Sequence, residues 1–82
     1  MSDKVIVTFV CNKKKIKTDL EVPTDITTIE LLKALNFAFD LGVDISDIKQ
    51  CFIKMENPIA LMRGNRMVSD YKIRNGSVIY YG

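Results

Sequence analysis

The last residue, Gly82, is the first candidate for chemistry, because some small proteins are joined to other molecules through a C-terminal glycine carboxylate. Such a carboxylate must reach into an activating enzyme on an extended tail, and each extended residue adds only about 3.3–3.6 Å of reach. Gly82 directly follows Tyr81, which we place in the last predicted strand. We therefore expect Gly82 to be simply where the fold stops. Activation at Gly82, as in a modifier or a sulfur carrier, is the alternative.

Other catalytic or metal-binding groups are scarce. The chain contains no histidine, which excludes the commonest general base and the commonest metal ligand. Cys11 and Cys51 lie far apart and form no CxxC motif, so neither a zinc site nor a disulfide framework is predicted. Asp40, Asp44 and Asp47 lack the ligand spacing of a calcium loop, and we expect them to cap and solvate a connector. We expect no catalytic activity, no metal and no cofactor.

A basic run, Lys13 to Lys15 with Lys17, is the main charged feature. No aromatic residue is interleaved with it, and the formal net charge of the chain is only +2, so the pattern argues against nucleic-acid binding. We interpret the run as a solvated hairpin tip. A contact with phosphate or with an anionic membrane stays open.

Length and composition indicate one compact domain over residues 1–82. The 82 residues are 48% hydrophobic and 27% charged, as in soluble globular domains. No apolar run approaches the roughly 18 residues of a membrane span, and no small-residue cleavage site follows the first strand. We expect both cysteines to be reduced core thiols. The sequence therefore predicts a cytoplasmic protein without stable membrane insertion.

The periodicity of apolar residues predicts five strands and one helix. Residues 4–11 and 16–22 alternate around a polar turn and predict a β-hairpin. Residues 27–41 repeat with a helical period, begin with a capping box of Thr27 and Glu30, and are followed by Gly42 as a stop. One helical turn is expected near residues 45–48. Further strands are expected at residues 50–56, 60–62 and 78–81, with an irregular segment at 68–73.

The helical period defines an apolar arc and an outlying aromatic residue. Phe37 falls on or beside the polar side of the predicted helix. The residues of the apolar arc are Ala34, Leu31, Ala38, Leu35, Phe39 and Leu32, with Ile29 at the first turn.

This order of elements predicts an α+β fold, in which a mixed sheet of four to five strands is packed on one side by one α-helix. A right-handed crossover through the helix places the last strand beside the first. This is the β-grasp arrangement.

Three segments also carry a resemblance to known proteins. Two segments are similar to the corresponding stretches of ubiquitin: Leu20-Glu21-Val22-Pro23-Thr24-Asp25 and Ser69-Asp70-Tyr71-Lys72-Ile73. Together with the opening Val5-Ile6-Val7-Thr8-Phe9 and the ending Asp70 to Gly76, they resemble the YukD/EsaB family of small bacterial ubiquitin-like proteins. The likeness extends over nearly the whole chain.

This resemblance implies a β-grasp fold and a non-catalytic function. It implies an accessory or regulatory component of a type VII secretion system, which acts by docking onto protein components of that system. Members of the family typically lack the diglycine tail of conjugated modifiers, which agrees with the interpretation of Gly82.

One face of the sheet is the candidate binding surface. The residues expected to face the helix are Val5, Val7, Ile53, Ile79 and Tyr81. On the opposite face, the β-grasp strand order brings Ile6, Phe52, Val78 and Tyr80 into one exposed apolar patch, with Thr8 and Lys54 at its edge. A contiguous exposed apolar patch usually marks an interface. The alternative is a reversed third strand, in which Phe52 is buried instead of Ile53.

We therefore predict that Ile6, Phe52, Val78 and Tyr80 bind a protein partner, with the two aromatic residues as anchors. Lys54 would set the orientation of the partner at the rim. The resemblance points to the same surface, because ubiquitin uses this sheet face for its partners. Self-association through the patch, giving a homo-oligomer, stays open.

Overall fold

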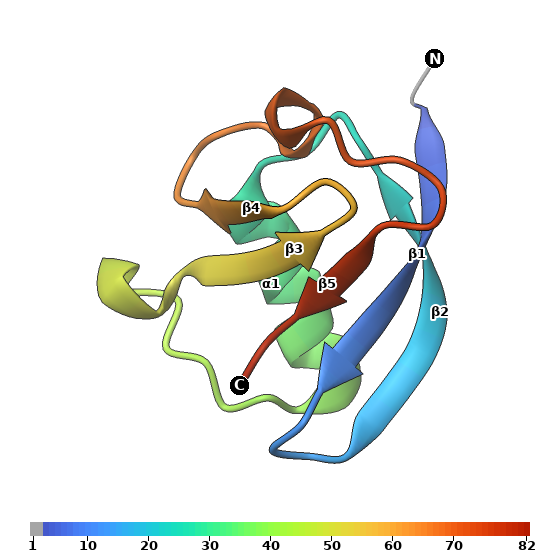
Figure 1. Ribbon diagram of the computed structural model, residues 1–82. Helices are drawn as coiled ribbons and strands as arrows, with labels where there is room; N and C mark the ends of the chain where they lie inside the picture. Colours follow the sequence, from blue (N-terminus) through green and yellow to red (C-terminus); the bar gives the residue numbers. More distant parts are fainter. Residues whose placement is uncertain (1–2) are drawn as a thin grey trace.

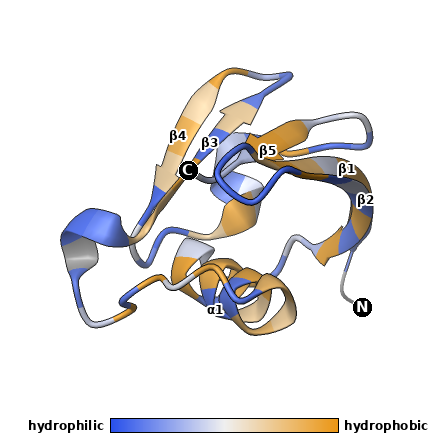
Figure 2. Cartoon of the chain, turned by 90° about the horizontal axis from the view of Figure 1, so that it is seen from below, coloured by the Kyte–Doolittle hydropathy of each residue, from blue (hydrophilic) through white to orange (hydrophobic). Residues whose placement is uncertain are grey.

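The computed structural model describes residues 3–82, and the side chains of all of them except Ile48. Within these residues, one sheet and one α-helix form two layers, with the helix against one face of the sheet (Figures 1 and 2). The elements in chain order are β1 (Lys4–Cys11), β2 (Ile16–Pro23), α1 (Thr28–Phe39), the 3-10 turn η1 (Ile48–Gln50), β3 (Phe52–Glu56), β4 (Ala60–Arg63), the 3-10 turn η2 (Val68–Tyr71) and β5 (Val78–Tyr80).

The sheet has five strands in the order β2-β1-β5-β3-β4. The central pair, β1 and β5, is parallel, and the other pairs are antiparallel. The predicted mixed sheet, with the last strand beside the first, is therefore confirmed. A parallel pair needs a long connection, and here the connection between β1 and β5 includes α1.

The β1–β2 hairpin follows from its alternating sequence. Its register pairs Lys4 with Pro23 at one end and Cys11 with Ile16 at the other. At the tip, the Lys15 amide donates to the Asn12 carbonyl oxygen (3.2 Å), and Lys15 adopts a left-handed backbone (φ 55°). Residues 12–15 at this tip are all polar and exposed to solvent, as expected.

The loop before β5 is fastened to β1 by a side chain. The Ile6 amide donates to Asn75 Oδ1 at 2.7 Å, and the Gly76 amide donates to the Ile6 carbonyl oxygen at 3.0 Å. Gly76 has φ +90°, a conformation that favours glycine. The Asn-Gly turn therefore sets where β5 enters the sheet.

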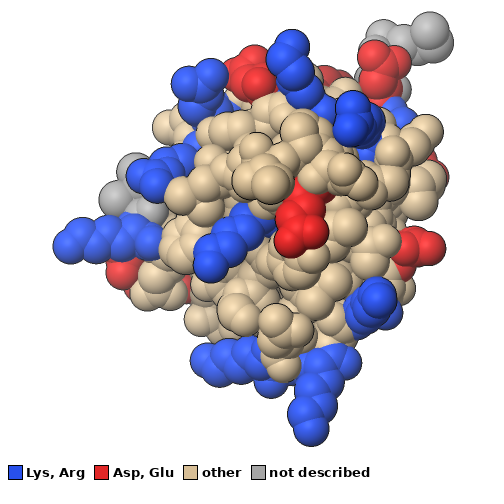
Figure 3. Space-filling view, in the orientation of Figure 1, with Lys and Arg blue, Asp and Glu red and all other residues tan. Residues whose placement is uncertain are grey.

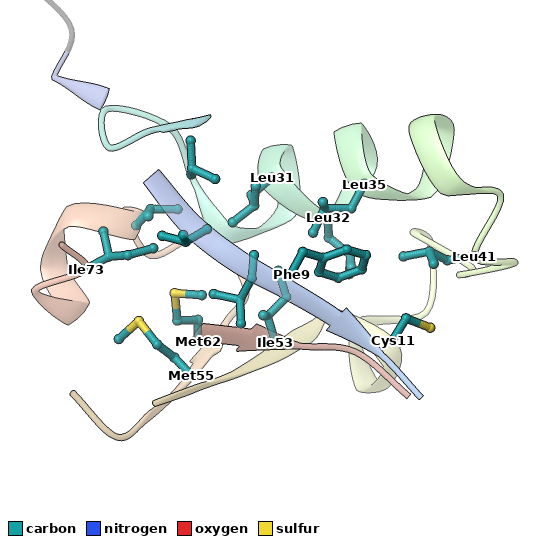
Figure 4. Close-up of a cluster of buried hydrophobic side chains, with 14 of the residues drawn as sticks. Phe9, Cys11, Leu31, Leu32, Leu35, Leu41, Ile53, Met55, Met62 and Ile73 are labelled. Atoms are coloured by element: carbon teal, nitrogen blue, oxygen red, sulfur yellow. The ribbon is translucent and has the colours of Figure 1, made fainter. Parts of the chain in front are cut away.

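The core lies between α1 and the sheet (Figure 4). Ile53 and Ile79 from the sheet and Leu32 from α1 are all fully buried. Phe9 packs on Phe39 with ring centroids 5.1 Å apart. Burying an aliphatic side chain of this size contributes about 1.5–3 kcal/mol, so this layer dominates the stability of the fold. The burial of Ile53 also shows that the third strand is not reversed.

Helix α1 begins as predicted and ends earlier than predicted. The capping box is present, because the Glu30 amide donates to Thr27 Oγ1 (3.1 Å) and the Thr27 amide donates to Glu30 Oε1 (3.2 Å). The expected continuation to Leu41 was wrong: the helix ends at Phe39, and Asp40 caps it in a left-handed conformation (φ 52°). Leu41 is buried nevertheless, because the connector turns its side chain back into the core.

Two alanines of the predicted apolar arc, Ala34 and Ala38, are exposed, because the arc is centred on Leu31 and Leu35. Phe37 is 94% exposed on the side of α1 away from the sheet.

The connector after α1 is held by local hydrogen bonds. Asn36 donates to the Val43 carbonyl oxygen (3.3 Å) and accepts from the Val43 amide (3.1 Å). Asp47 Oδ1 accepts from the Lys49 amide (3.1 Å) in η1, which begins later in the chain than the predicted turn at 45–48. The Ser46 hydroxyl and amide bond Asp44 and lower the pKa of its carboxyl. These aspartates cap loops as expected, and no acidic or cysteine cluster suited to a metal occurs within residues 3–82.

Two cysteines, Cys11 and Cys51, are buried free thiols. The described part of the chain also contains no helix that is long and apolar enough to cross a membrane.

Candidate protein-binding surface

The candidate surface is the outer face, which we define as the face of the sheet turned away from α1. Tyr80 of β5 lies near its middle, between Val10 of β1 and Lys54 of β3. Leu61 of β4 stands opposite Lys54 and extends this row to the edge of the sheet. Because residues directly opposite each other on neighbouring strands point to the same face, these four side chains share the outer face.

A second row lies next to the first. Val78 stands between Thr8 of β1 and Glu56 of β3. Ile6 is two residues before Thr8, so it lies diagonally beside Val78. Phe52 is two residues before Lys54, opposite Arg63 at the other end of the face. The five predicted residues thus follow a diagonal band across the sheet, with Ile6 and Phe52 at its two ends.

The side chains of this band are accessible. Ile6 is 48% and Phe52 36% exposed, while Val78 and Tyr80 are half-buried and Lys54 is exposed. Figure 3 views this face and shows a largely uncharged surface, with basic and acidic side chains side by side near its middle and mostly basic groups around its rim. Outer faces of sheets usually carry polar residues, so this apolar surface is unusual for a face in contact with water alone.

Part of the outer face is hollowed. Phe52 and Tyr80 line a groove of about 510 Å³, which Ile59 and Gly82 also border. A smaller hollow of about 370 Å³ lies next to it, near Leu61. Phe52 and Lys54 line both hollows, a position in which the aromatic ring can contact a partner that enters either one.

Sequence reasoning missed three apolar residues of this region. Val10 faces outward beside Tyr80, Leu61 is 38% exposed, and Ile59 is 89% exposed in the turn before β4. The alternation of β1 already placed Val10 on the outer face. Strand β4 is too short to show an alternation, so the sequence gives no comparable signal for Leu61.

Tyr80, near the middle of the outer face, has a raised pKa. Partial burial raises the pKa of the Tyr80 hydroxyl, and the Glu56 carboxylate beside it raises the pKa further. Tyr80 is therefore a neutral hydrogen-bonding phenol at all physiological pH values. Lys54, which carries a positive charge, is the residue of β3 directly opposite Tyr80.

Gly82 lies against the end of β1. A side chain at this position would meet Lys13 Cβ at 3.4 Å and Cys11 Sγ at 3.6 Å. The preceding Tyr81 amide donates to the Val10 carbonyl oxygen (3.0 Å), and the Tyr81 ring lies 6.5 Å from that of Phe52. Strand β5 thus ends at Tyr80, one residue earlier than predicted, and Gly82 (φ +90°) lies just beyond the sheet, close to the end of β1.

Tyr71 supports the free side of β4. Its hydroxyl accepts from the Arg63 amide (3.2 Å) and lies 3.5 Å from the Arg63 carbonyl oxygen, to which it donates. The hydroxyl is therefore hydrogen-bonded to the main chain of β4. Asp70, next to Tyr71, pairs with Arg66 at 4.0 Å.

Solved structures of other proteins share this arrangement of strands and helix. No family model and no curated protein sequence matches the chain. The ubiquitin-like domain of tubulin-binding cofactor B matches with a TM-score of 0.74 and 15% identity, over 98% of this chain and 89% of that domain. The fold is ubiquitin-like. The C-terminal ubiquitin-like domain of mouse tubulin-specific chaperone e also matches, with a TM-score of 0.71 and 13% identity, over 96% of this chain and 84% of that one.

These likenesses confirm the predicted ubiquitin-like fold. At 13% and 15% identity they say nothing of a particular partner, and they do not test the resemblance to the YukD/EsaB family.

Proposed function

We propose that this ubiquitin-like chain is a non-catalytic protein-interaction module that docks its outer face onto a partner protein. The observation that carries the proposal is the apolar band from Ile6 through Val78 and Tyr80 to Phe52 on an accessible sheet face. Burial of apolar surface is the main driving force for protein association, and partly exposed aromatic residues beside hollows are typical anchors.

Lys54 would set the orientation of the partner on this surface. It stands opposite Tyr80 inside the band, so a partner that covers Tyr80 must also accommodate a positive charge. A complementary acidic group on the partner would fix the register of docking, and a basic group would oppose it.

We further propose that the partner is a component of a type VII secretion system, and that this chain is an accessory or regulatory part of that system in the cytoplasm. This step rests on the resemblance of three sequence segments to the YukD/EsaB family. The two buried free thiols suit a reducing compartment. The similarity to domains of tubulin cofactors is one of fold and selects no partner.

Affinity capture from the native cells tests this proposal. The chain, tagged at its N-terminus so that Gly82 stays free, should recover type VII secretion proteins, identified by mass spectrometry. Recovery of an activating enzyme, or of the chain with a thiocarboxylate or an isopeptide bond at Gly82, would instead contradict the proposal and support a modifier or sulfur carrier.

A further inference from the structure

The two edges of the sheet differ in how open they are to another strand. The β4 edge has only four residues, and both main-chain groups of Arg63 are bonded by the Tyr71 hydroxyl. The next carbonyl oxygen, that of Gly64, accepts from the Ile29 amide at 3.2 Å. Segments outside the sheet therefore cover the Arg63 end of this short edge.

The β2 edge is long and uncovered. The Thr8 amide donates to Ser77 and the Val10 carbonyl oxygen accepts from Tyr81, so the even-numbered residues of β1 bond to β5. The odd-numbered residues of β1 must then bond to β2, through partners such as Thr18 and Leu20.

It follows that the main-chain groups of Lys17, Asp19 and Glu21 point away from the sheet. Within residues 3–82, no turn, loop or side chain is hydrogen-bonded to the main chain of these three residues. A row of free donors and acceptors of this kind is a template for an added strand.

The charges on β2 are complementary to those of β2 of a second copy when the two strands pair antiparallel. With Thr18 opposite Thr18 of the second copy, each Lys17 faces an Asp19, and each Ile16 faces a Leu20. Pairing centred on Asp19 would set two carboxylates opposite each other, and pairing centred on Leu20 would set Asp19 opposite Glu21. Like charges directly opposite destabilise a strand pair and unlike charges stabilise it, so only the register centred on Thr18 suits every charge.

Main-chain geometry agrees with the same register. Lys17 and Asp19 are both residues whose amide and carbonyl groups face outward, so each Lys17–Asp19 pair can exchange two main-chain hydrogen bonds. On the inner side, Ile16 and Leu20 are only half-buried in the single chain and would cover each other across the new strand pair.

We propose that two copies of this chain form a symmetric dimer by antiparallel pairing of their β2 strands, centred on Thr18. The two-fold axis is then perpendicular to the sheet, and the two sheets become one continuous sheet. Both copies of α1 lie on one side of it, and both outer faces lie on the other, where they stay open to partners. This interface is separate from the apolar band.

A charge-exchange experiment tests both the interface and its register. Lys17→Glu sets a carboxylate opposite Asp19, and Asp19→Lys sets an ammonium group opposite Lys17. Each single variant should weaken the dimer by about tenfold or more, because two attractive pairs per dimer become repulsive. An equimolar mixture of the two variants restores both attractive pairs and should form a heterodimer. Lys33→Glu, which makes the same charge change on α1, should dimerise like the wild type.

Analytical ultracentrifugation from micromolar to millimolar concentration measures these equilibria, and circular dichroism verifies that every variant folds. In the wild type, hydrogen exchange by NMR should show the amides of Lys17 and Asp19 becoming protected as concentration rises. The proposal is overturned if the wild type stays monomeric at millimolar concentration. It is equally overturned if a dimer forms that both variants retain, or if mixing the variants does not restore association.

Discussion

Phe52 and Ile53 are neighbours in β3 but lie on opposite faces of the sheet, Ile53 fully buried under α1 and Phe52 partly exposed on the outer face. The candidate surface depends on this relationship. A shift of one residue would exchange their positions and remove the aromatic anchor from the outer face.

Alanine substitutions at the two positions should therefore differ in their effect on stability. Ile53→Ala leaves a cavity in the core and should lower the free energy of unfolding by about 2–5 kcal/mol. Phe52→Ala removes a side chain that already contacts solvent and should cost about 1 kcal/mol. Urea unfolding followed by circular dichroism measures both. Equal losses, or a larger loss for Phe52→Ala, would mean that the faces of β3 are assigned wrongly.

The start of α1 gives a second prediction about stability. Thr27→Ala removes the hydroxyl that accepts from the Glu30 amide and should lower the free energy of unfolding by about 1 kcal/mol. Thr27→Ser keeps an acceptor at this position and should lose much less. Urea titrations of the wild type, Thr27→Ala and Thr27→Ser under the same conditions measure these losses. An equal loss of stability in the two variants would exclude the helix cap as the cause.

Tyr80 should titrate above the ordinary tyrosine pKa of 10.0, mainly because its ring is partly buried and further because Glu56 lies beside it. Glu56→Gln should lower this pKa only in part, since burial is the larger cause. An NMR titration of the tyrosine rings measures the change, with Glu30→Gln on α1 as the control. An unchanged Tyr80 midpoint in Glu56→Gln would show that the two groups do not interact.

The raised pKa of Tyr80 also determines in which direction the stability of the fold changes with pH. Because the pKa of Tyr80 is higher in the folded chain, the unfolded chain loses this proton first as the pH rises above 10.0. The contribution of Tyr80 is therefore fully present below that pH and is lost as the pH rises through the folded-state value. The stability of Glu56→Gln should decline less steeply than that of the wild type in this range.

The sequence predicted most of the fold because its signals are local and agree with one another. The alternation of β1 and β2 and the Thr27–Glu30 capping box were each sufficient to define an element. The end of α1 was predicted wrongly because Leu41 continues the apolar period of the helix. Its burial comes from a chain reversal at Asp40, a residue type that also occurs inside helices.

The candidate surface was harder to predict than the fold. The outward direction of Ile6, Phe52, Val78 and Tyr80 follows from alternation within each strand. Their spacing depends on the register between strands, and no local signal in the sequence encodes the pairing of Tyr80 with Lys54. For this reason the sequence suggested a compact patch, and the structure shows a diagonal band. The docking role of these residues stays a prediction.

Paired aspartate substitutions on the two sides of the molecule test the docking role most directly. Phe52→Asp places a charge in the apolar band, and Phe37→Asp makes the same change on the far side of α1, where Phe37 is 94% exposed. Wild type and both variants, each verified to fold by circular dichroism, are used for affinity capture from the native cells with quantitative mass spectrometry. Phe37→Asp should recover the same partners as the wild type. Phe52→Asp should lose them by about thirtyfold or more, the effect of a hot-spot residue worth about 2 kcal/mol. If Phe52→Asp retains the partners, or if only Phe37→Asp loses them, the outer face of the sheet is not the binding surface.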